Sequence, residues 1–569
     1  MATPASSLHG SAAPDPMDDS VPTSVAAACG GDGPPAAGLV LVGRIVPVPG
    51  APVAPAQAVL FRDGRVAALG SEAAVRDAAG PRAEVEVLPR EAVLLPGFVD
   101  GHCHLLWCAA AAAQLDLRDV DSLDELARRV ARRAAELPPG TWIEGYGWDQ
   151  SRFDPPTWPE RALLDRAAPE HPVLLRRVCR HVAVANGAAL AAAGVHRETP
   201  DPPGGRFVRD PETGELTGLL EETAIDRVAA ARPEPGFEER LAGLLEVIRT
   251  AHAAGITAVH SHDVHRPGEL GDVVALYAAA RRRGRPLRVA LDVGWAAFGD
   301  ARRWGPSGHG DEWLRMGSIK FFADGSLGGR TAALREPYHD GDGAERGLLR
   351  HPPEELAARV AEAAAAGYQV AIHCIGDRAI DVALEAVAAA RGRGGPGRHR
   401  LIHVQVMAPE HPRRLAAAGV VAEIQPRFLA SDLAFVEERL GPERCRYAYA
   451  WRSLIDAGVP VSAGSDAPIE PLPPLEGVQA AVTRDDLAGH PPGGWHPEQR
   501  LGVGEALKAY TAGAAYGALA EGLWGSLLPG AAADAVVLGA DPWRVAPGEL
   551  RSIPVLATYV GGVPVFRRR

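Results

Sequence analysis

Lysine is almost absent from this sequence. Lys320 and Lys508 are the only two lysines among the 59 basic residues of the 569-residue chain, so arginine occupies every other basic position. This preference is typical of a GC-rich coding sequence, and most of the arginines therefore need no functional explanation. A surplus of positive charge is missing too, since the formal net charge is −12 and the isoelectric point is about 5.9. Because nucleic-acid binding usually needs a basic face, this balance argues against it.

Long apolar runs and paired cysteines are missing as well. No segment offers roughly 18 or more apolar residues free of charge, so we expect no transmembrane helix and no membrane partner. The N-terminus has neither the basic start nor the apolar core of a signal peptide, and its composition predicts a disordered tail over residues 1–36. The six cysteines show no CxxC pair, so we expect free thiols and a cytoplasmic protein. They are Cys29, Cys103, Cys108, Cys179, Cys374 and Cys445.

Short β-rich segments occupy both ends of the remaining chain. At 37–96 the runs GLVLVGRIVPVPG and QAVLFRDGRVAALG alternate with turns, and RDGR is typical of a β-hairpin. At 525–569 the same style returns in AAADAVVLGADPW and IPVLATYVGGVPVF. Because chain termini often lie close together, we expect one small β-sandwich domain built from both ends. Two separate small sheets are the alternative.

The middle of the chain, residues 97–524, alternates short apolar runs with helices rich in Ala, Leu, Arg and Glu. Eight such β-then-α units predict an α/β fold with a parallel (β/α)8 barrel of the TIM type, and a doubly wound open sheet is the alternative. The runs are 92–102, 255–263, 286–295, 317–325, 368–377, 399–407, 419–428 and 458–468. The interval between the first two runs is too long for one helix, so we expect an inserted subdomain or lid at about 105–250.

Polar side chains gather at the carboxyl ends of these runs, where the catalytic loops of a barrel open. His102 and His104 are two residues apart and so lie on the same side of an extended strand. His373, His403 and Asp466 end the fifth, sixth and eighth runs. Any one of them alone is more often a structural residue, but together they would converge in one pocket. Imidazoles with a carboxylate suit a borderline divalent ion, so we expect a site for one or two metal ions, with zinc as the expected metal.

Lys320 lies in the fourth run, GSIKFFADG, where an amine is an unusual choice for this chain. A divalent cation would repel a protonated amine, whereas burial and positive neighbours lower the pKa of an amine. A neutral amine can react with CO₂ to form a carbamate, an anionic oxygen ligand that can bridge two ions. Arginine cannot do so because it does not deprotonate. The scarcity of lysine favours the carbamate, and an ion pair with Asp324 is the alternative.

Taken together, these motifs resemble the amidohydrolase superfamily, and within it the YtcJ-like members of amidohydrolase family 3, a group that includes N-substituted formamide deformylase. The resemblance covers about residues 38–569. It rests on LLPGFVDGHCHL, EGYGWDQSRF, IKFFADGSLGGRTAAL, AIHCIGDRAID, RLIHVQVM, SAGSDAPIEPLPPLEGV and GSLLPGAAADAVVL. It implies a metal-dependent hydrolase made of a β-sandwich and a barrel, and it is compatible with a homodimer.

The resemblance also implies a role for each residue at the strand ends. His102 and His104 would hold the more buried ion, and His373 and His403 would hold the second. A carbamylated Lys320 would bridge the two ions. If only one ion is bound, the same residues still form a mononuclear site.

Asp466 would contact the buried ion and the nucleophilic water, and would act as general base and then general acid. We therefore expect cleavage of a C–N amide-type bond in an N-acyl or N-formyl amine, with a small organic molecule as the substrate. An esterase, lactonase or cyclic-imide hydrolase at the same site is the alternative within enzymes. A catalytically silent barrel retained as a binding protein is the alternative outside them.

Residues next to these motifs are further candidates for substrate contacts. Asp324 and Arg330 belong to the segment DGSLGGRT that follows Lys320, and Arg330 could bind a substrate carboxylate or form a salt bridge within its loop. Trp148 could line the pocket mouth, but packing in a core is its favoured role. The resemblance makes His181 a candidate that faces the substrate, and capping of a helix is its alternative role.

A second His-x-His motif, His260 and His262 in HSHDV, ends the second run. Strand two does not normally supply metal ligands in the superfamily that this chain resembles. We therefore expect these two histidines to line the pocket or to support the ligands rather than to bind the metal.

Overall fold

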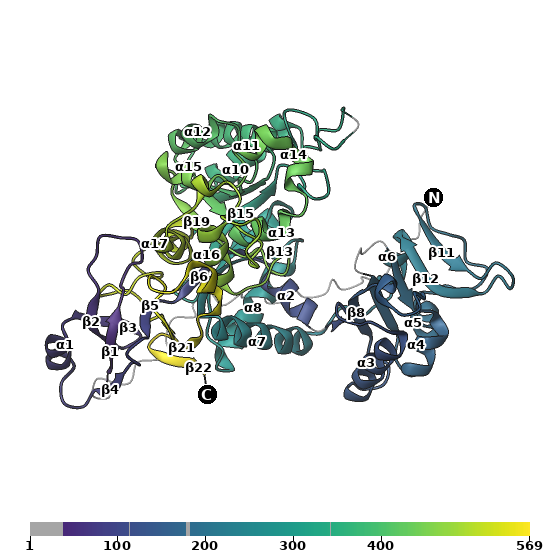
Figure 1. Cartoon of the computed structure of the whole chain (residues 1–569), viewed down its shortest axis with the longest axis horizontal. Helices are drawn as coiled ribbons and strands as arrows, with labels where there is room; N and C mark the ends of the chain where they lie inside the picture. Colours follow the sequence, from purple (N-terminus) through teal and green to yellow (C-terminus); the bar gives the residue numbers. More distant parts are fainter. Residues whose placement is uncertain (1–37, 113, 178–181, 342, 569) are drawn as a thin grey trace, which may run out of the picture. The chain divides into compact units, whose positions relative to one another are not determined.

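Eight parallel strands from the middle of the chain join in one barrel sheet in the computed structural model, which describes residues 38–112, 114–177, 182–341 and 343–568 (Figure 1). Their order in the sheet follows the chain, so each strand pairs with the one before it. They are β6 (Phe98–Cys103), β13 (Ile256–Val264), β14 (Arg288–Gly294), β15 (Leu314–Phe322), β16 (Gln369–Cys374), β17 (Arg400–His403), β18 (Val421–Ile424) and β19 (Val461–Ala463). The predicted barrel is confirmed, and each of the eight predicted runs overlaps one of these strands.

The first and last strands of the barrel are joined by backbone hydrogen bonds just beyond their ends. Asp466 N donates to His102 O at 2.7 Å, and His104 N donates to Ala467 O at 2.8 Å. The strands are buried because helices cover the outside of the barrel and side chains fill its interior. Every residue of β13 and of β14 is buried. Burial on both faces explains the apolar residues of these strands, although β13 also carries His260 and His262 and β14 carries Asp292.

Amphipathic helices follow the barrel strands. In α11, Ile380, Ala383, Leu384 and Val387 recur at intervals of one, three or four residues and pack in the barrel core, which is the pattern of a helix with one buried face. The helices of this part are α2 (Leu105–Ala112), α7 (Phe237–Ala253), α8 (Glu269–Arg282), α9 (Phe298–Trp304), α10 (Pro353–Ala365), α11 (Asp377–Ala390), α12 (His411–Ala418), α13 (Pro426–Asp432), α14 (Val436–Cys445), α15 (Trp451–Asp456), α16 (Pro474–Thr483), α17 (Val503–Lys508) and α18 (Ala514–Gly517).

Strands from both ends of the chain pair in a second sheet. Its order is β22-β21-β20-β5-β1-β2-β3, and β4 pairs with β1 in addition. The strands are β1 (Leu39–Ile45), β2 (Ala56–Arg62), β3 (Arg65–Gly70), β4 (Glu84–Val87), β5 (Val93–Pro96), β20 (Ala535–Leu538), β21 (Val555–Val560) and β22 (Val563–Arg567), with α1 (Glu72–Ala79) between β3 and β4. Because β20 pairs with β5, the two chain ends share one hydrogen-bonded unit instead of forming two separate sheets.

The apolar run at 92–102, predicted as one barrel strand, is two strands. β5 belongs to the end sheet and β6 to the barrel, and the chain passes from one to the other at Gly97. A Cβ atom on residue 97 would lie 2.2 Å from Thr257 Oγ1, so only glycine fits there. The pattern of apolar residues does not reveal this break because both strands are buried.

The insertion after the first barrel strand has a sheet of its own, with the order β11-β12-β10-β9-β8-β7. Its elements are β7 (Leu115–Asp116), α3 (Leu123–Glu136), β8 (Ile143–Trp148), α4 (Arg161–Ala167), β9 (Val173–Arg177), β10 (Val182–Ala185), α5 (Gly187–Ala192), β11 (Gly205–Arg209), β12 (Leu216–Glu222) and α6 (Thr223–Ala229). Helices α2 and α7, which begin and end the predicted interval 105–250, pack instead in the barrel core through Leu105, Leu241 and Leu244. The inserted subdomain therefore begins at β7.

The predicted tail at 1–36 lies outside the described residues. Within the described ranges, no helix combines the length and the apolar character that crossing a bilayer would require. Cys103, Cys108, Cys374 and Cys445 are buried free thiols.

Candidate metal centre

The predicted metal ligands meet at the carboxyl ends of the barrel strands. They are His102 in β6, His104 directly after it, Lys320 in β15, His373 in β16, His403 at the end of β17 and Asp466 in the loop after β19. Parallel strands of a barrel present their carboxyl ends at one opening, so residues far apart in the sequence share one site. Five of the six side chains are buried, and His373 is partly buried.

Four of these side chains lie close together. Lys320 Nζ lies 3.1 Å from His102 Nε2, His104 Nε2 lies 3.2 Å from Asp466 Oδ1, and His102 Nε2 lies 3.5 Å from the same oxygen. Two ligand atoms that bind one zinc ion tetrahedrally, each at about 2.1 Å, are themselves about 3.4 Å apart. One donor atom each from His102, His104 and Asp466 lies within 4.8 Å of the others. The residues present therefore fit a divalent ion in both chemistry and spacing.

His373 and His403 form a second pair beside this cluster. Their ring centroids are 4.5 Å apart, and His403 Nε2 lies 4.0 Å from Asp466 Oδ2. His373 Nε2 lies 2.9 Å from the backbone carbonyl oxygen of Gly325 and 3.5 Å from Asp324 Oδ1. Asp466 thus has one carboxylate oxygen next to His102 and His104 and the other nearest to His403, an arrangement compatible with the predicted one-ion or two-ion site.

Two of these residues have a strained backbone. His403 has φ of 75° and Asp466 has φ of 58°, in the left-handed region that residues with a Cβ atom seldom adopt. Such a conformation costs about 1–3 kcal/mol and persists where surrounding contacts impose it. The hydrogen bond from Asp466 N to His102 O and that from Val404 N to Cys374 O, 3.1 Å long, supply such contacts. Strain of this kind is common at functional sites.

Hydrogen bonds behind the ligands set their orientation. His104 Nδ1 lies 3.1 Å from His262 O, so this ring donates through Nδ1 and keeps the lone pair of Nε2 for a ligand role. Asp100 accepts hydrogen bonds from His102 N at 3.1 Å, from Ser465 N at 2.9 Å and from Ser465 Oγ at 2.6 Å. Asp100 therefore ties β6 to the loop after β19, which together carry three of the ligands.

Burial controls protonation at this site. It lowers the pKa of Lys320 to about 8, although Asp466 and Glu423 oppose the shift. Burial, followed by the positive charge of Lys320, holds the pKa of His102 well below its usual value, and the same two causes lower that of His373 to about 4. At neutral pH the rings of His102 and His373 are therefore neutral, and the Lys320 amine loses its proton more readily than an exposed lysine does. These are the states that metal ligation and carbamate formation need.

A buried ion network next to the ligands was not found from the sequence. The guanidinium of Arg400 in β17 bonds Asp292 in β14, Glu423 in β18 at 2.9 Å and His260 Nδ1 at 2.5 Å. Glu423 Oε1 in turn lies 3.7 Å from His102 Nδ1. This contact fits the supporting role that was predicted for His260 as one of two possibilities. The available signal was a charged residue inside each of three strand runs, namely Asp292, Arg400 and Glu423.

Backbone hydrogen bonds to the Asp324 carboxylate hold the loop that follows Lys320. The Asp324 carboxylate accepts backbone hydrogen bonds from Ala333 at 2.8 Å, Ile375 at 3.0 Å and Gly376 at 2.9 Å, and burial raises its pKa to about 7. Across the described residues, no ion pair joins Lys320 to Asp324, which had been the alternative role of this lysine.

Two of the predicted substrate contacts have structural partners instead. Arg330 pairs with Asp340 at 2.8 Å, which is the salt bridge within the loop that the sequence left open. Trp148 is fully buried in the core of the inserted subdomain, and its Nε1 donates to Leu175 O at 2.9 Å. Trp148 therefore packs in a core, the role favoured from the sequence, and does not line the pocket mouth. His181, the remaining candidate, lies outside the described residues.

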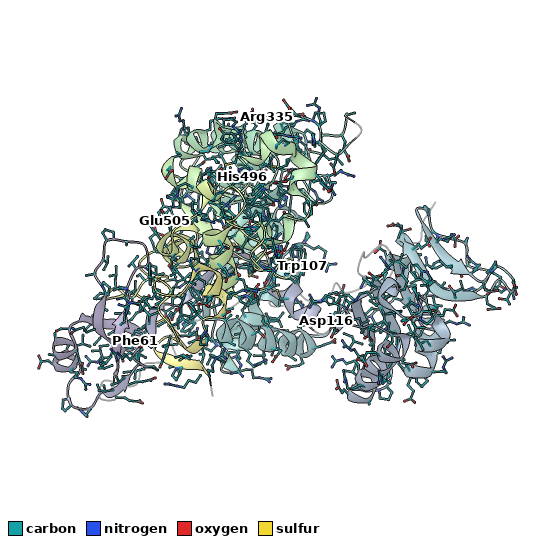
Figure 2. The ribbon with its side chains drawn as sticks, in the orientation of Figure 1. Phe61, Trp107, Asp116, Arg335, His496 and Glu505 are labelled. Carbon is teal, nitrogen blue, oxygen red and sulfur yellow. The ribbon has the colours of Figure 1, made fainter. Side chains whose placement is uncertain are left out.

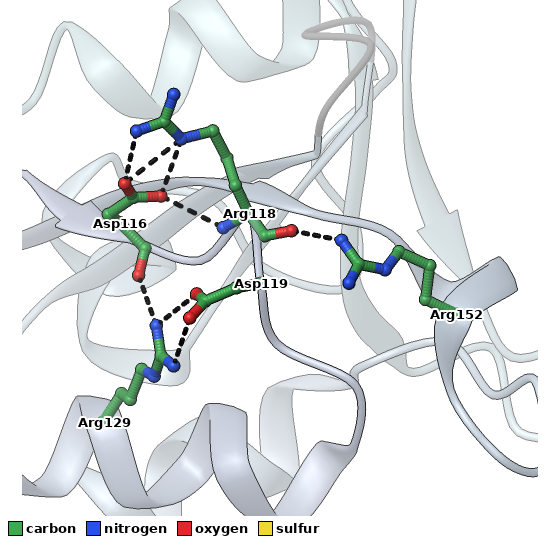
Figure 3. Close-up of a pocket in the computed structure, with 5 residues that line it drawn as sticks. All are labelled: Asp116, Arg118, Asp119, Arg129 and Arg152. Carbon is green, nitrogen blue, oxygen red and sulfur yellow. Dashed lines mark hydrogen bonds and ion pairs between the residues drawn. The ribbon is translucent and has the colours of Figure 1, made fainter. Parts of the chain in front are cut away.

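A depression of about 480 Å³ in the inserted subdomain is lined by charged residues alone (Figure 3). Arg118 pairs with Asp116 at 2.6 Å and Arg129 pairs with Asp119 at 2.7 Å, while Arg152 donates to the carbonyl oxygen of Arg118. Because the two carboxylates neutralise their arginines, this depression offers little net charge to a ligand. None of the barrel histidines lines it, and we assign it no part in the chemistry.

The barrel and its cluster of histidines, lysine and aspartate define a metal-dependent hydrolase as the class of this protein. Comparison with known proteins agrees with this class. The profile described as "Amidohydrolase family" matches residues 90–566, and the chain belongs to this family.

Individual relatives resemble the chain over most of its length. It is 37% identical over 521 residues to YtcJ of Bacillus subtilis (strain 168), which is named as an amidohydrolase, covering 90% of this chain and 96% of the relative. It is 31% identical over 529 residues to N-substituted formamide deformylase of Arthrobacter pascens, covering 90% and 95%. The crystal structure of an uncharacterized metal-dependent hydrolase from Pyrococcus horikoshii OT3 matches with a TM-score of 0.75 and 28% identity, covering 90% and 99%. The predicted YtcJ-like assignment is therefore confirmed.

Proposed function

We propose that this protein is a metal-dependent hydrolase that cleaves the C–N bond of a small N-acyl or N-formyl amine. The observation that carries the proposal is the position of Asp466, whose Oδ1 lies next to His102 and His104 and whose Oδ2 lies 4.0 Å from His403. The similarity to N-substituted formamide deformylase supports cleavage of a C–N bond over other hydrolytic reactions.

The proposed metal is zinc, because the donors are imidazoles and a carboxylate. His102, His104 and Asp466 would hold one ion, and His373 and His403 would hold a second. When bound, such an ion lowers the pKa of a water molecule and polarises a substrate carbonyl.

Asp466 is the residue that we propose moves the proton. Its side chain is 10% exposed, compared with 1% for His102, so of the two it is the more open to a reactant. Its carboxylate would accept a proton as the water oxygen forms its bond to the carbonyl carbon. It would then pass that proton to the leaving nitrogen as the C–N bond breaks, so that a neutral amine leaves.

We further propose that Lys320 carries a carbamate. Its neutral amine would attack CO₂, forming an N–C bond and releasing one proton, and the new oxygens would join the metal ligands. Its 2% exposure, its pKa of about 8 and its contact with His102 support this role. Native mass spectrometry should show a mass increase of one CO₂ that acid removes and that Lys320→Ala lacks. An unmodified Lys320 in protein with a full metal complement would contradict the carbamate.

Asp466→Asn tests the proton-transfer role. Asparagine keeps the size and one oxygen of the side chain but loses the charge that accepts a proton. We expect kcat/KM to fall about 10²–10⁴-fold, while the metal content measured by elemental analysis changes little. Asp456→Asn is the matched control, because Asp456 is exposed and pairs with Arg452 at the surface. Normal turnover by Asp466→Asn would refute the role.

A substrate panel separates the remaining functions. The purified protein would be assayed on N-formyl and N-acyl amines and on matched esters, lactones and cyclic imides, before and after chelation and return of zinc. A higher kcat/KM on the amines supports the proposal, and a higher value on the esters, lactones or imides assigns one of those reactions instead. No bound metal and no hydrolysis of any compound would point to a binding protein.

A further inference from the structure

A third group of histidines lies at the end of β13, beside the proposed catalytic ligands. His262 ends the HSH motif and His265 follows it, and their ring centroids are 4.4 Å apart. The ring of His104 lies 5.3 Å from that of His262 and 6.2 Å from that of His265. One ring nitrogen of each lies within 4.8 Å of one nitrogen of each of the others. Three imidazoles with this spacing are a metal-binding arrangement.

The ring of His262 favours a bound ligand, because its two nitrogens lack hydrogen-bond partners among the described residues. Its side chain is 1% exposed, and neither Nδ1 nor Nε2 has a hydrogen-bond partner among the described residues. His265 Nε2 is also buried without a partner in that part of the chain. A buried polar atom left without a bond costs about 1–3 kcal/mol, so this arrangement is expensive unless a ligand occupies it.

The surroundings hold this cluster rigidly. Leu105 N donates to Ser261 Oγ at 3.0 Å and Leu106 N donates to Asp263 Oδ1 at 3.0 Å, so the start of α2 is tied to the end of β13. His265 N donates to Glu269 at 2.8 Å, which fixes the loop that carries this ring.

Trp107, labelled in Figure 2, covers the cluster from α2. Its ring stacks on His104 at 4.3 Å and on His265 at 4.8 Å, with interplanar angles of 8° and 16°. It is 46% exposed, so the ring that covers the cluster borders solvent.

We propose that His104, His262 and His265 form an auxiliary site for a divalent transition-metal ion, distinct from the proposed catalytic positions but sharing His104 with them. Three imidazoles without a carboxylate favour zinc, copper or nickel over magnesium or calcium. Because His104 also belongs to the cluster with Asp466, an ion in the auxiliary site competes for a catalytic ligand. The consequence is inhibition of the enzyme by excess zinc.

Metal counting tests the site directly. Zinc-loaded wild-type protein and the double variant His262→Ala/His265→Ala would be dialysed against rising free zinc, and bound zinc per chain would be measured by elemental analysis. The wild type should bind one ion more than the double variant. His490→Ala, which removes an exposed histidine paired with Asp486, should match the wild type. Equal binding by wild type and double variant overturns the proposal. The count needs no substrate, so it stands apart from any failure of the proposed function.

The fluorescence of Trp107 supplies a second measurement that leaves the three histidines unchanged. It tests the site even if the variant His262→Ala/His265→Ala does not fold. Copper added to zinc-loaded protein should quench a part of the tryptophan fluorescence, and that part should be missing in Trp107→Phe. Identical quenching in the two proteins overturns the proposal.

Once a substrate is known, activity in excess zinc would be compared with activity in stoichiometric zinc. The ratio of the two activities should be lower for wild type than for His265→Ala. An equal ratio in both would overturn the sharing of His104.

Discussion

Arg400→Met puts the buried ion network to a quantitative test. The Arg400 guanidinium is 1% exposed and bonds Asp292, Glu423 at 2.9 Å and Ser318 Oγ at 2.9 Å. Methionine fills much of the same volume but supplies no charge, so two buried carboxylates lose their partner. Removal of one partner from a buried ion pair costs about 3–5 kcal/mol. We expect the free energy of unfolding to fall by about that amount above neutral pH.

The cost of this substitution should depend on pH in a defined direction. Burial raises the pKa of Asp292, but Arg400, His260 and the hydrogen bonds from Ser318 together lower it below the usual value. Burial raises the pKa of Glu423 to about 7 even with Arg400 present. Without Arg400, both pKa values should rise. A carboxyl group whose folded pKa exceeds its unfolded pKa adds stability at low pH that is lost as the pH rises through the folded value. The variant should therefore lose more stability at about pH 8 than at about pH 5.

Urea unfolding curves followed by circular dichroism would measure both effects. Arg427→Met is the control, because Arg427 is partly exposed and pairs with Glu476 at 3.0 Å. Loss of such a pair near the surface costs about 0–1 kcal/mol. If Arg400→Met costs no more than this control, or if its cost is the same at both pH values, the reasoning is refuted.

Three further predictions address the lysine, the inserted subdomain and the loop after β15. Lys320→Arg keeps a positive charge but cannot form a carbamate, so we expect hydrolysis to be lost, while Lys508→Arg keeps it; activity in Lys320→Arg would rule out the carbamate. Trp148→Ala should destabilise the inserted subdomain by about 3–5 kcal/mol, seen as faster hydrogen exchange there, and unchanged exchange would contradict its core role. Gly347→Ala would place a Cβ atom 1.9 Å from a backbone carbonyl oxygen. Its melting temperature should fall well below that of Gly343→Ala, which has a similar positive φ but open space; equal values would contradict the clash.

The barrel strands could be located from the sequence because buried parallel strands are short, continuous apolar runs. The break at Gly97 could not, since β5 and β6 are both apolar and only the approach of Thr257 shows why glycine is needed. The extent of the insertion was also hidden. Helices α2 and α7 have the apolar spacing of any packed helix, and spacing alone does not tell which core they join.

The roles of several side chains at the site were also hidden in the sequence. His260 and His262 look equivalent in HSHDV, yet His260 bonds Arg400, while neither ring nitrogen of His262 has a partner among the described residues. Arg330 and Trp148 had two possible roles each, and their partners Asp340 and the subdomain core decided between them. Local spacing does not encode these choices, because each depends on which distant segment supplies the neighbouring atoms.

The sequence by itself determined the family and the location of the candidate ligands. Imidazole, carboxylate and a rare buried amine at the ends of successive parallel strands must meet at one opening of a barrel, whatever the details of packing. Only the tertiary structure decided which donor atoms face one another, where the backbone at His403 and Asp466 is strained, and that His265 joins His262 and His104 in a further cluster. Those features arise from contacts and desolvation between segments far apart in the chain, and no local pattern contains them.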